Sequence, residues 1–323
     1  MAWREEYTQI VRNMIAADVW GLPGKKVFVD PVLGSDGGDG SIVNPLKTFT
    51  TGKSLLRNNR NDALFLIGGA SALTETLPIT WNLSYTHLIG LAAPVMYGIR
   101  NRLVNSTDGT GSQTQTPFFT LSGNGCRVEN LMVSQEGSHA TLNAVALYIS
   151  GARNYLKNVT ARVLGALAVV DASKRDVVFA SPDGENYFDH CTFGTDTYDG
   201  SANAANYVME FNGANQTARQ FFADCVFFGS GSSGAAFILA TTVNCLSSMQ
   251  RFQRCLFYNN DHGTMNAMTQ AFNIAAGCGG DFIMDNDTVV YGATALETVD
   301  SGRLFWTNAA AAATSGRLLN PTG

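Results

Sequence analysis

The sequence predicts an all-β fold, a right-handed parallel β-helix solenoid with an N-terminal amphipathic capping helix. Three observations support this prediction. A six-residue pattern recurs six times, glycine and small polar residues are frequent enough for a chain that turns often, and only 15% of the residues are charged. At 323 residues the chain could form two ordinary domains, but solenoids often use this length as one.

Each copy of the repeat has apolar residues at its first and last positions and a polar residue at its third. The third positions fall at residues 130, 158, 190, 224, 254 and 286, so neighbouring copies are 28 to 34 residues apart. A six-residue segment cannot bury its apolar side alone, whereas coils stacked about 4.8 Å apart form a continuous core. We therefore expect one coil of the solenoid for each copy.

Alignment of the copies predicts three buried columns of side chains along the stack. The first position holds Val128, Leu156, Phe188, Phe222, Phe252 and Met284. The sixth position holds Val133, Ala161, Phe193, Phe227, Phe257 and Val289. The fourth position holds Leu131, Val159, Cys191, Cys225 and Cys255, until Asp287 ends the series. The stacked cysteines are expected to be free thiols that pack as small apolar residues.

The polar third position predicts a bend between two apolar segments. Asparagine suits this bend, because it tolerates left-handed backbone geometry and can hydrogen-bond to a stacked neighbour. The expected turn ladder consists of Asn130, Asn158 and Asn286. The other three copies carry His190, Asp224 and Arg254, so the ladder is expected to be incomplete.

A further set of short stretches precedes the repeats. They are Val27–Pro31, Gly34–Asp36, Asp39–Ser41, Asn44–Pro45, Lys47–Thr48, Asp62–Ile67, Thr74–Leu77 and His87–Gly90. This part of the chain resembles the opening coils of pectin-lyase-like β-helix proteins, and with the six repeats the resemblance spans roughly residues 25 to 292. It implies a parallel β-helix. Lyases, hydrolases, phage tailspikes and inert structural proteins share that fold, so the resemblance does not select a function.

Three segments are expected: an N-terminal cap or attachment segment at 1–24, the β-helix at 25–292 and a C-terminal tail at 293–323. Within residues 2–20, apolar side chains recur at helical spacing. The apolar face consists of Trp3, Tyr7, Ile10, Val11 and Met14. This helix is expected either to cover the open strand edge of the first coil or to dock on a capsid, a tail or a sister subunit. Residues 100–117 are expected to form a polar loop between coils.

Composition argues against several classes of function. The net charge is −5 without a long basic run, which disfavours nucleic-acid binding, and no apolar stretch is long enough for membrane insertion. The six cysteines form no CxxC pair, so neither a metal nor another cofactor is expected. The charged fraction is well below the typical value of about 25%, which favours burial between subunits, and a homotrimer is expected. The N-terminus lacks a signal-peptide pattern, which predicts synthesis in a host cytoplasm.

Glycan cleavage on this fold would need suitably placed acids. A hydrolase uses two carboxyl groups about 5–9.5 Å apart. Asp189 and Asp285 both precede a bend and are the fallback candidates, but they lie three coils apart, roughly 14 Å. No catalytic residue is therefore assigned.

The leading hypothesis is a bacteriophage virion structural protein, a non-enzymatic surface component that acts through rigid shape and attachment. Both a head decoration and a spike or fibre fit this hypothesis, with other capsid or tail proteins as partners and a host surface glycan as a candidate ligand. One alternative is a tailspike-like polysaccharide hydrolase or lyase on the same scaffold. A second alternative is a bacterial carbohydrate-binding surface module.

Overall fold

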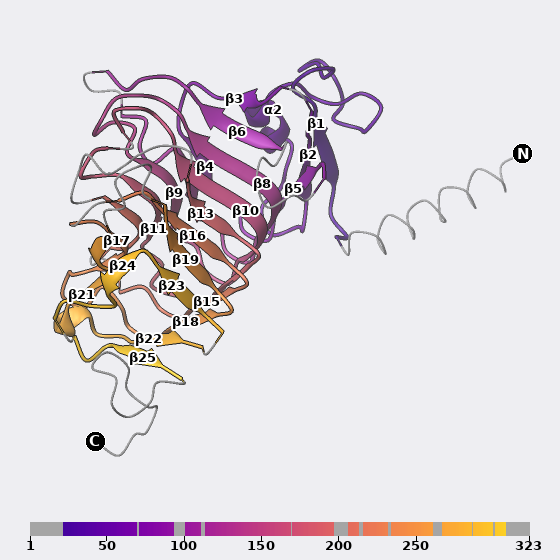
Figure 1. Cartoon of the computed structure of the whole chain (residues 1–323). Helices are drawn as coiled ribbons and strands as arrows, with labels where there is room; N and C mark the ends of the chain where they lie inside the picture. The colour runs from indigo at the N-terminus through magenta and orange to yellow at the C-terminus, as the bar shows by residue number, and fades with distance from the viewer. Residues whose placement is uncertain are drawn as a thin grey trace, which may run out of the picture.

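The computed structural model describes residues 22–69, 71–93, 101–110, 114–168, 170–196, 206–212, 216–231, 234–260, 267–285, 287–299 and 301–307. Their strands pair in parallel, and the ribbon colour in Figure 1 changes coil by coil from one end of the stack to the other. The predicted all-β parallel solenoid is confirmed. The predicted capping helix, with Trp3, Tyr7, Ile10, Val11 and Met14, lies outside the described residues.

The first face of the solenoid is a continuous parallel stack of ten strands. It contains β1 (Lys26–Val29), β2 (Ala63–Ile67), β5 (His87–Leu91), β8 (Arg127–Gln135), β10 (Tyr155–Val163), β12 (Asn186–Asp189), β15 (Gln220–Ala223), β18 (Gln250–Gln253), β22 (Phe282–Met284) and β25 (Leu304–Trp306). The long strands β8 and β10 continue around the bend into the second face.

The second face also contains β3 (Leu73–Thr74), β6 (Arg102–Asn105), β13 (Thr192–Gly194), β16 (Val226–Gly229), β19 (Leu256–Asn259) and β23 (Val289–Tyr291). The third face contains β4 (Ile79–Trp81), β7 (Phe119–Leu121), β9 (Val145–Ile149), β11 (Arg175–Phe179), β14 (Tyr207–Phe211), β17 (Ala236–Ala240) and β21 (Phe272–Ile274). A separate pair joins β20 (Met268–Gln270) to β24 (Ala293–Ala295). The helical elements of the described residues are α2 (Phe49–Ser54) and the 3-10 turn η2 (Ala276–Cys278).

The interior of the solenoid is filled by stacked aromatic rings. Phe188, Phe222 and Phe252 lie in register with no exposed surface, and their ring centroids are 4.6 and 4.7 Å apart. Phe193, Phe227 and Phe257 form a second stack with centroid separations of 5.3 and 4.3 Å. Each buried ring contributes on the order of 1.5–3 kcal/mol of transfer free energy, so the columns are a main source of stability.

The inner cysteine column lies between these two stacks. Cys191, Cys225 and Cys255 are buried members of the same apolar core, and all six cysteines of the chain are free. Burial raises the pKa of the Cys225 thiol, which keeps it protonated. These thiols therefore pack as small apolar side chains.

The bend between the first and second faces requires a left-handed backbone, whatever residue occupies it. Asn130 and Asn158 have φ values of 52° and 49°, and Asn158 Nδ2 donates a hydrogen bond of 2.9 Å to Asn130 Oδ1. His190, Asp224 and Arg254 occupy the same bend at φ values of 51° to 54°. Asn286 lies outside the described residues. The backbone geometry is therefore more uniform along the bend than the side-chain ladder.

Near the C-terminal end, the expected register differs from the structure by one residue. Val290 pairs with Phe257, and Val289 pairs with Leu256 and is 54% exposed. The hydroxyl of Thr288 accepts a hydrogen bond from the Cys255 amide at 3.2 Å, which places Thr288 beside Cys255. The assignments of Val289 to the sixth-position column and of Asp287 to the inner column were wrong. The bend between β22 and β23 is one residue longer than the earlier bends.

Two expected irregular segments contain paired strands. Residues 102–105, placed in a loop by the sequence pattern, form β6 and pair with β8. Beyond residue 292, β24 pairs with β20 and β25 pairs with β22. Parallel pairing therefore continues past the boundary expected for the repeats, as far as Trp306. Residues 308–323 lie outside the described residues.

Candidate ligand-binding groove

Aromatic side chains also stack on the outside of the first face. Successive residues of a strand point to opposite sides, so the residue before each first-column position points outward. We term these residues the outer column: Arg127, Tyr155, Tyr187, Phe221 and Arg251, which pair in register across β8, β10, β12, β15 and β18. Tyr155 and Tyr187 have ring centroids 5.7 Å apart, and those of Tyr187 and Phe221 are 4.9 Å apart. The Arg251 guanidinium covers the end of this aromatic stack, 5.3 Å from the Phe221 centroid.

A groove of about 250 Å³ runs beside the outer column. The buried amides of Asn186 and Gln220 lie between two rows of more exposed residues, because alternate residues at the strand starts face inward and outward. One row contains Tyr187, Phe221 and Arg251, and the other contains Glu185, Arg219 and Met249. Tyr187 is 38% exposed and Met249 is 41% exposed, so both rows present apolar surface to a ligand.

The charged residues along the groove are held in ion pairs. Glu185 accepts hydrogen bonds from Arg153 and from Arg219, both at 2.9 Å, so one carboxylate joins three coils. These contacts, with Arg219 contributing most, lower the pKa of Glu185. Arg251 donates two hydrogen bonds to Asp285, at 3.1 and 2.8 Å. Asn186 Nδ2 donates to Gln220 Oε1 at 2.9 Å, which fixes the amides between the two rows.

Asp189 and Asp285, the fallback catalytic candidates, lie on the same outward-facing row of the first face, next to the outer column. Asp189 accepts a hydrogen bond from Tyr155 Oη at 2.8 Å, contacts His190 Nδ1, and lies 3.7 Å from Lys157 Nζ. Burial would raise the pKa of Asp189, but the contacts with His190 and Tyr155 outweigh burial and lower it. The strands β12, β15, β18 and β22 separate the two acids by three steps, roughly 14 Å. The structure therefore does not bring them together.

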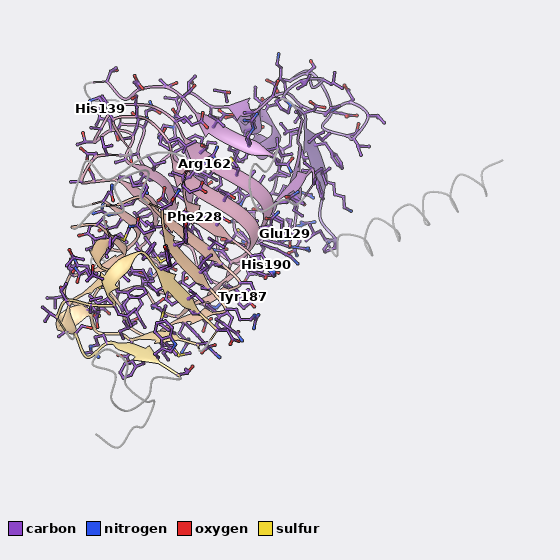
Figure 2. All side chains as sticks on the ribbon, in the orientation of Figure 1. Glu129, His139, Arg162, Tyr187, His190 and Phe228 are labelled. Atoms are coloured by element: carbon purple, nitrogen blue, oxygen red, sulfur yellow. The ribbon has the colours of Figure 1, made fainter. Side chains whose placement is uncertain are left out.

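Asp189, His190 and Asp224 each offer a ligand atom within 4.8 Å of the others, as a metal site requires. Figure 2 shows His190 near Tyr187 and Glu129 along one side of the solenoid. Asp224 already accepts hydrogen bonds from Arg254 at 2.8 and 2.7 Å, and Asp189 is held by Tyr155. A cation would have to displace Arg254 and face its positive charge, so this cluster fits a metal ion poorly.

The outer column and the groove were not predicted from the sequence. The signal was present, because the residue before the first repeat position is aromatic or arginine in five consecutive copies, from Arg127 to Arg251. The residue before that is an amide in four copies, at Asn154, Asn186, Gln220 and Gln250. A repeat extended by three residues toward the N-terminus would have contained both rows of the groove and the amides between them. Among the described residues, no helix has the length and apolar character needed to cross a membrane.

No protein-family model matches this chain, and no curated protein is similar to it in sequence. Solved structures are similar in fold. Pectin methylesterase PemA from Erwinia chrysanthemi matches with a TM-score of 0.51 and 15% identity, over 91% of this chain and 92% of that chain. The pectin methylesterase from Aspergillus niger matches at 0.53 and 13%, over 88% and 84%. A rhamnogalacturonan lyase matches at 0.53 and 12%, over 83% and 68%. These likenesses show a pectin-lyase-like parallel β-helix fold and do not specify a function.

Proposed function

We propose that this protein is a non-catalytic attachment component of a bacteriophage virion that binds a host surface glycan in the groove of the first face. The observation that carries the proposal is the groove itself. It combines the Tyr187 and Phe221 rings with the partly exposed carboxylate of Glu185 and the guanidinium groups of Arg219 and Arg251, a mixture of apolar and directional polar contacts that suits a carbohydrate. The structure provides a rigid scaffold for these groups, because each lies on or next to a paired strand.

The hydrogen bonds and ion pairs made by Asp189 and Asp285 support a non-catalytic role. A general acid needs a carboxyl group that holds a proton near neutral pH, and its pKa is therefore raised. The pKa of Asp189 is lowered instead. Asp285 accepts hydrogen bonds from Nε and Nη2 of Arg251. Among the described residues of this row, Glu129 is the nearest acid to Asp189. Glu129 is two coils away, beyond Lys157, and is paired with Arg127.

The proposal includes a homotrimer carried by other capsid or tail proteins, as a head decoration or as a spike or fibre. Exposed apolar side chains on the second face support such assembly. Tyr291 is 55% exposed and Val289 is 54% exposed, and they continue a row that includes Leu256 and Tyr258. A contiguous apolar patch of this kind marks an interaction surface in many soluble proteins.

A combined binding and degradation experiment tests the glycan part of the proposal. The chain would be incubated with a panel of bacterial surface polysaccharides, and retention, new reducing ends and ultraviolet absorbance of unsaturated uronates would be measured. We expect retention of at least one polysaccharide without release of oligosaccharides, and weaker retention after Tyr187→Ala. Tyr148→Ala, an aromatic substitution on β9 of the third face, is the matched control and is expected to bind as the unmodified chain does.

Release of defined oligosaccharides would instead make the chain a hydrolase or lyase, and absence of retention would reject glycan binding. The virion location has a separate test. Antibodies against the chain are expected to label purified phage particles in electron micrographs, and size-exclusion chromatography with light scattering is expected to give three times the mass of one chain. Unlabelled particles would reject the virion part of the proposal.

A further inference from the structure

We infer that the groove binds the acidic group of a glycan between Arg219 and Arg251, an inference that rests on the proposed glycan binding. The described residues in and beside the groove include three guanidinium groups, those of Arg153, Arg219 and Arg251. Two carboxylates oppose them, those of Glu185 and Asp285, and two of the guanidinium groups share Glu185. One positive charge in this set has no protein counter-charge, so the groove attracts an anion.

The strand register places the two arginines at opposite corners of one patch. Phe221 pairs with Arg251 across β15 and β18, and the same register places Arg219 beside Met249. The other two corners, Phe221 and Met249, carry no charge. Strands about 4.8 Å apart, with about 3.3 Å between residues, put the Cα atoms of diagonal corners roughly 8 Å apart. Both arginines line the groove, so their long side chains can reach one anion placed between them.

The two protein carboxylates lie on the outer sides of this pair of arginines. Glu185 lies on the coil before Arg219, and Asp285 lies on the coil after Arg251. Among the described residues that line the groove, Glu185 is the one acid. The space between the two guanidinium groups is therefore free of negative charge from these residues, and a ligand anion placed there meets no repelling carboxylate.

Both arginines keep N–H donors for such an anion, because a guanidinium has five. Glu185 accepts from Nη2 of Arg219, and no acceptor among the described residues bonds to Nε or Nη1. Asp285 accepts from Nε and Nη2 of Arg251, which leaves its Nη1. An acidic group can thus bond to both guanidinium groups without breaking either ion pair. Hydrogen bonds between ionised groups are about twice as strong as those between neutral groups, so these contacts outweigh hydrogen bonds to sugar hydroxyls.

The size and composition of the groove define the class of ligand. A carboxylate on a sugar and a phosphodiester in a glycan each carry the single negative charge that would balance the groove. Met249, which is 41% exposed, and the ring of Phe221 provide apolar contacts beside the acidic group. At about 250 Å³, the groove is smaller than the roughly 300–1,000 Å³ of sites that enclose drug-sized molecules. We therefore expect it to hold one acidic unit of the glycan.

Calorimetry with matched charged and neutral probes tests the inference on the full chain. A sialic acid hexamer and a glycerol phosphate hexamer are the acidic probes. The methyl ester of the sialic acid hexamer and cellohexaose are the neutral probes, and each is measured at 50 and 500 mM sodium chloride. We expect an acidic probe to bind about tenfold more tightly than the neutral probes at the lower salt concentration, and salt to weaken it about threefold or more. Comparison of the two acidic probes distinguishes a carboxylate from a phosphate.

Substitutions separate the two arginines from the general charge of the surface. Arg219→Gln and Arg251→Gln are each expected to weaken binding of the acidic probe about tenfold, the loss of one charge-assisted hydrogen bond. Arg153→Gln is the matched control, because it removes the same charge and another 2.9 Å contact of Glu185 but lies outside the lining of the groove. It is expected to change the affinity less than about twofold. Glu185→Gln removes a negative charge beside Arg219 and is expected to tighten binding.

The outcomes distinguish this inference from the proposed glycan binding. Neutral probes that bind as tightly as the acidic ones, without an effect of salt or of Arg219→Gln, would overturn the inference and leave glycan binding in place. Acidic binding that Arg153→Gln weakens as much as Arg219→Gln does would also overturn it, since the general surface charge would then be responsible. Failure of every probe, while a polysaccharide of the panel is retained, would reject the inference alone. Failure in both experiments would reject the inference and the proposed glycan binding together.

Discussion

The inner and outer columns of the first face are built from adjacent residues of the same strands, yet they have different roles. Inside, Phe188, Phe222 and Phe252 stack with no exposed surface. Outside, Tyr187 and Phe221 stack at a similar separation of 4.9 Å but remain partly exposed. The spacing is common to both because the coil repeat sets it, and burial alone distinguishes them. A solenoid can therefore carry a stabilising ladder and a candidate binding ladder on one set of strands.

The largest expected effect comes from the inner column. Phe222→Ala removes a fully buried ring that contacts Phe188, Phe252 and Phe227. We expect the free energy of unfolding to fall by about 3–5 kcal/mol, since the neighbouring coils cannot collapse into the cavity. Denaturation in guanidinium chloride, followed by circular dichroism, measures this change. A loss below about 1 kcal/mol would show that the inner stack is not the main source of stability.

The second prediction concerns the pH dependence of stability. His87 on β5 lies in register with Arg127 on β8, at the N-terminal end of the outer column. Burial, and then the charge of Arg127, lower the pKa of His87 from 6.5 to about 4. The unfolded chain therefore binds a proton that the folded chain does not between these values. Stability from this residue is complete above about pH 6.5 and is lost as the pH falls toward 4, by up to about 3 kcal/mol.

Unfolding measured between pH 7 and pH 4 tests this expectation. His87→Gln removes the titrating ring and keeps a side chain that can accept the hydrogen bond from the Arg127 amide. Its stability should change less over this interval than that of the unmodified chain. Equal slopes for the two proteins would contradict the assignment to His87.

The bend between the faces is expected to have an intermediate effect. Asn158→Ala keeps a Cβ at a φ of 49° and removes the hydrogen bond to Asn130, so we expect a loss of about 1–2 kcal/mol. Asn158→Gly removes the same hydrogen bond but tolerates the left-handed backbone, and should lose less. Thermal unfolding of the two variants measures the difference. A glycine variant that is the less stable of the two would show that the left-handed backbone is not the main cause of the loss.

The smallest expected effect on stability comes from the outer column. Phe221→Ala removes a ring that stacks on Tyr187 and lies under Arg251, and we expect a loss of about 1 kcal/mol or less. The same variant should lose most of its glycan affinity, measured by calorimetry alongside Phe222→Ala at a temperature where both are folded. If Phe221→Ala destabilises the chain as much as Phe222→Ala, the outer column is structural and not a binding surface.

Most of the inner architecture could be predicted, because burial imposes a strong pattern on the sequence. An inward position in a coil tolerates few residue types, so Phe188, Phe222 and Phe252 recur at the same point of the repeat. The outer rows are under no such constraint, and Tyr187, Phe221 and Arg251 share no single residue class. The position of Val289 was predicted wrongly because one extra residue in a bend shifts the register without changing the apolar character of the strand.

The sequence by itself determined the all-β parallel solenoid, its repeat and its buried columns, because each depends on local alternation between apolar and polar residues. Only the tertiary structure decided which outward residues meet. Glu185, Arg219 and Met249 are about 30 residues apart in the chain, and stacking of the coils places them in one row. Coil length and bend length fix that register, and both depend on packing of the whole stack. The groove is therefore a product of tertiary structure built from residues that, taken one at a time, carry no signature of binding.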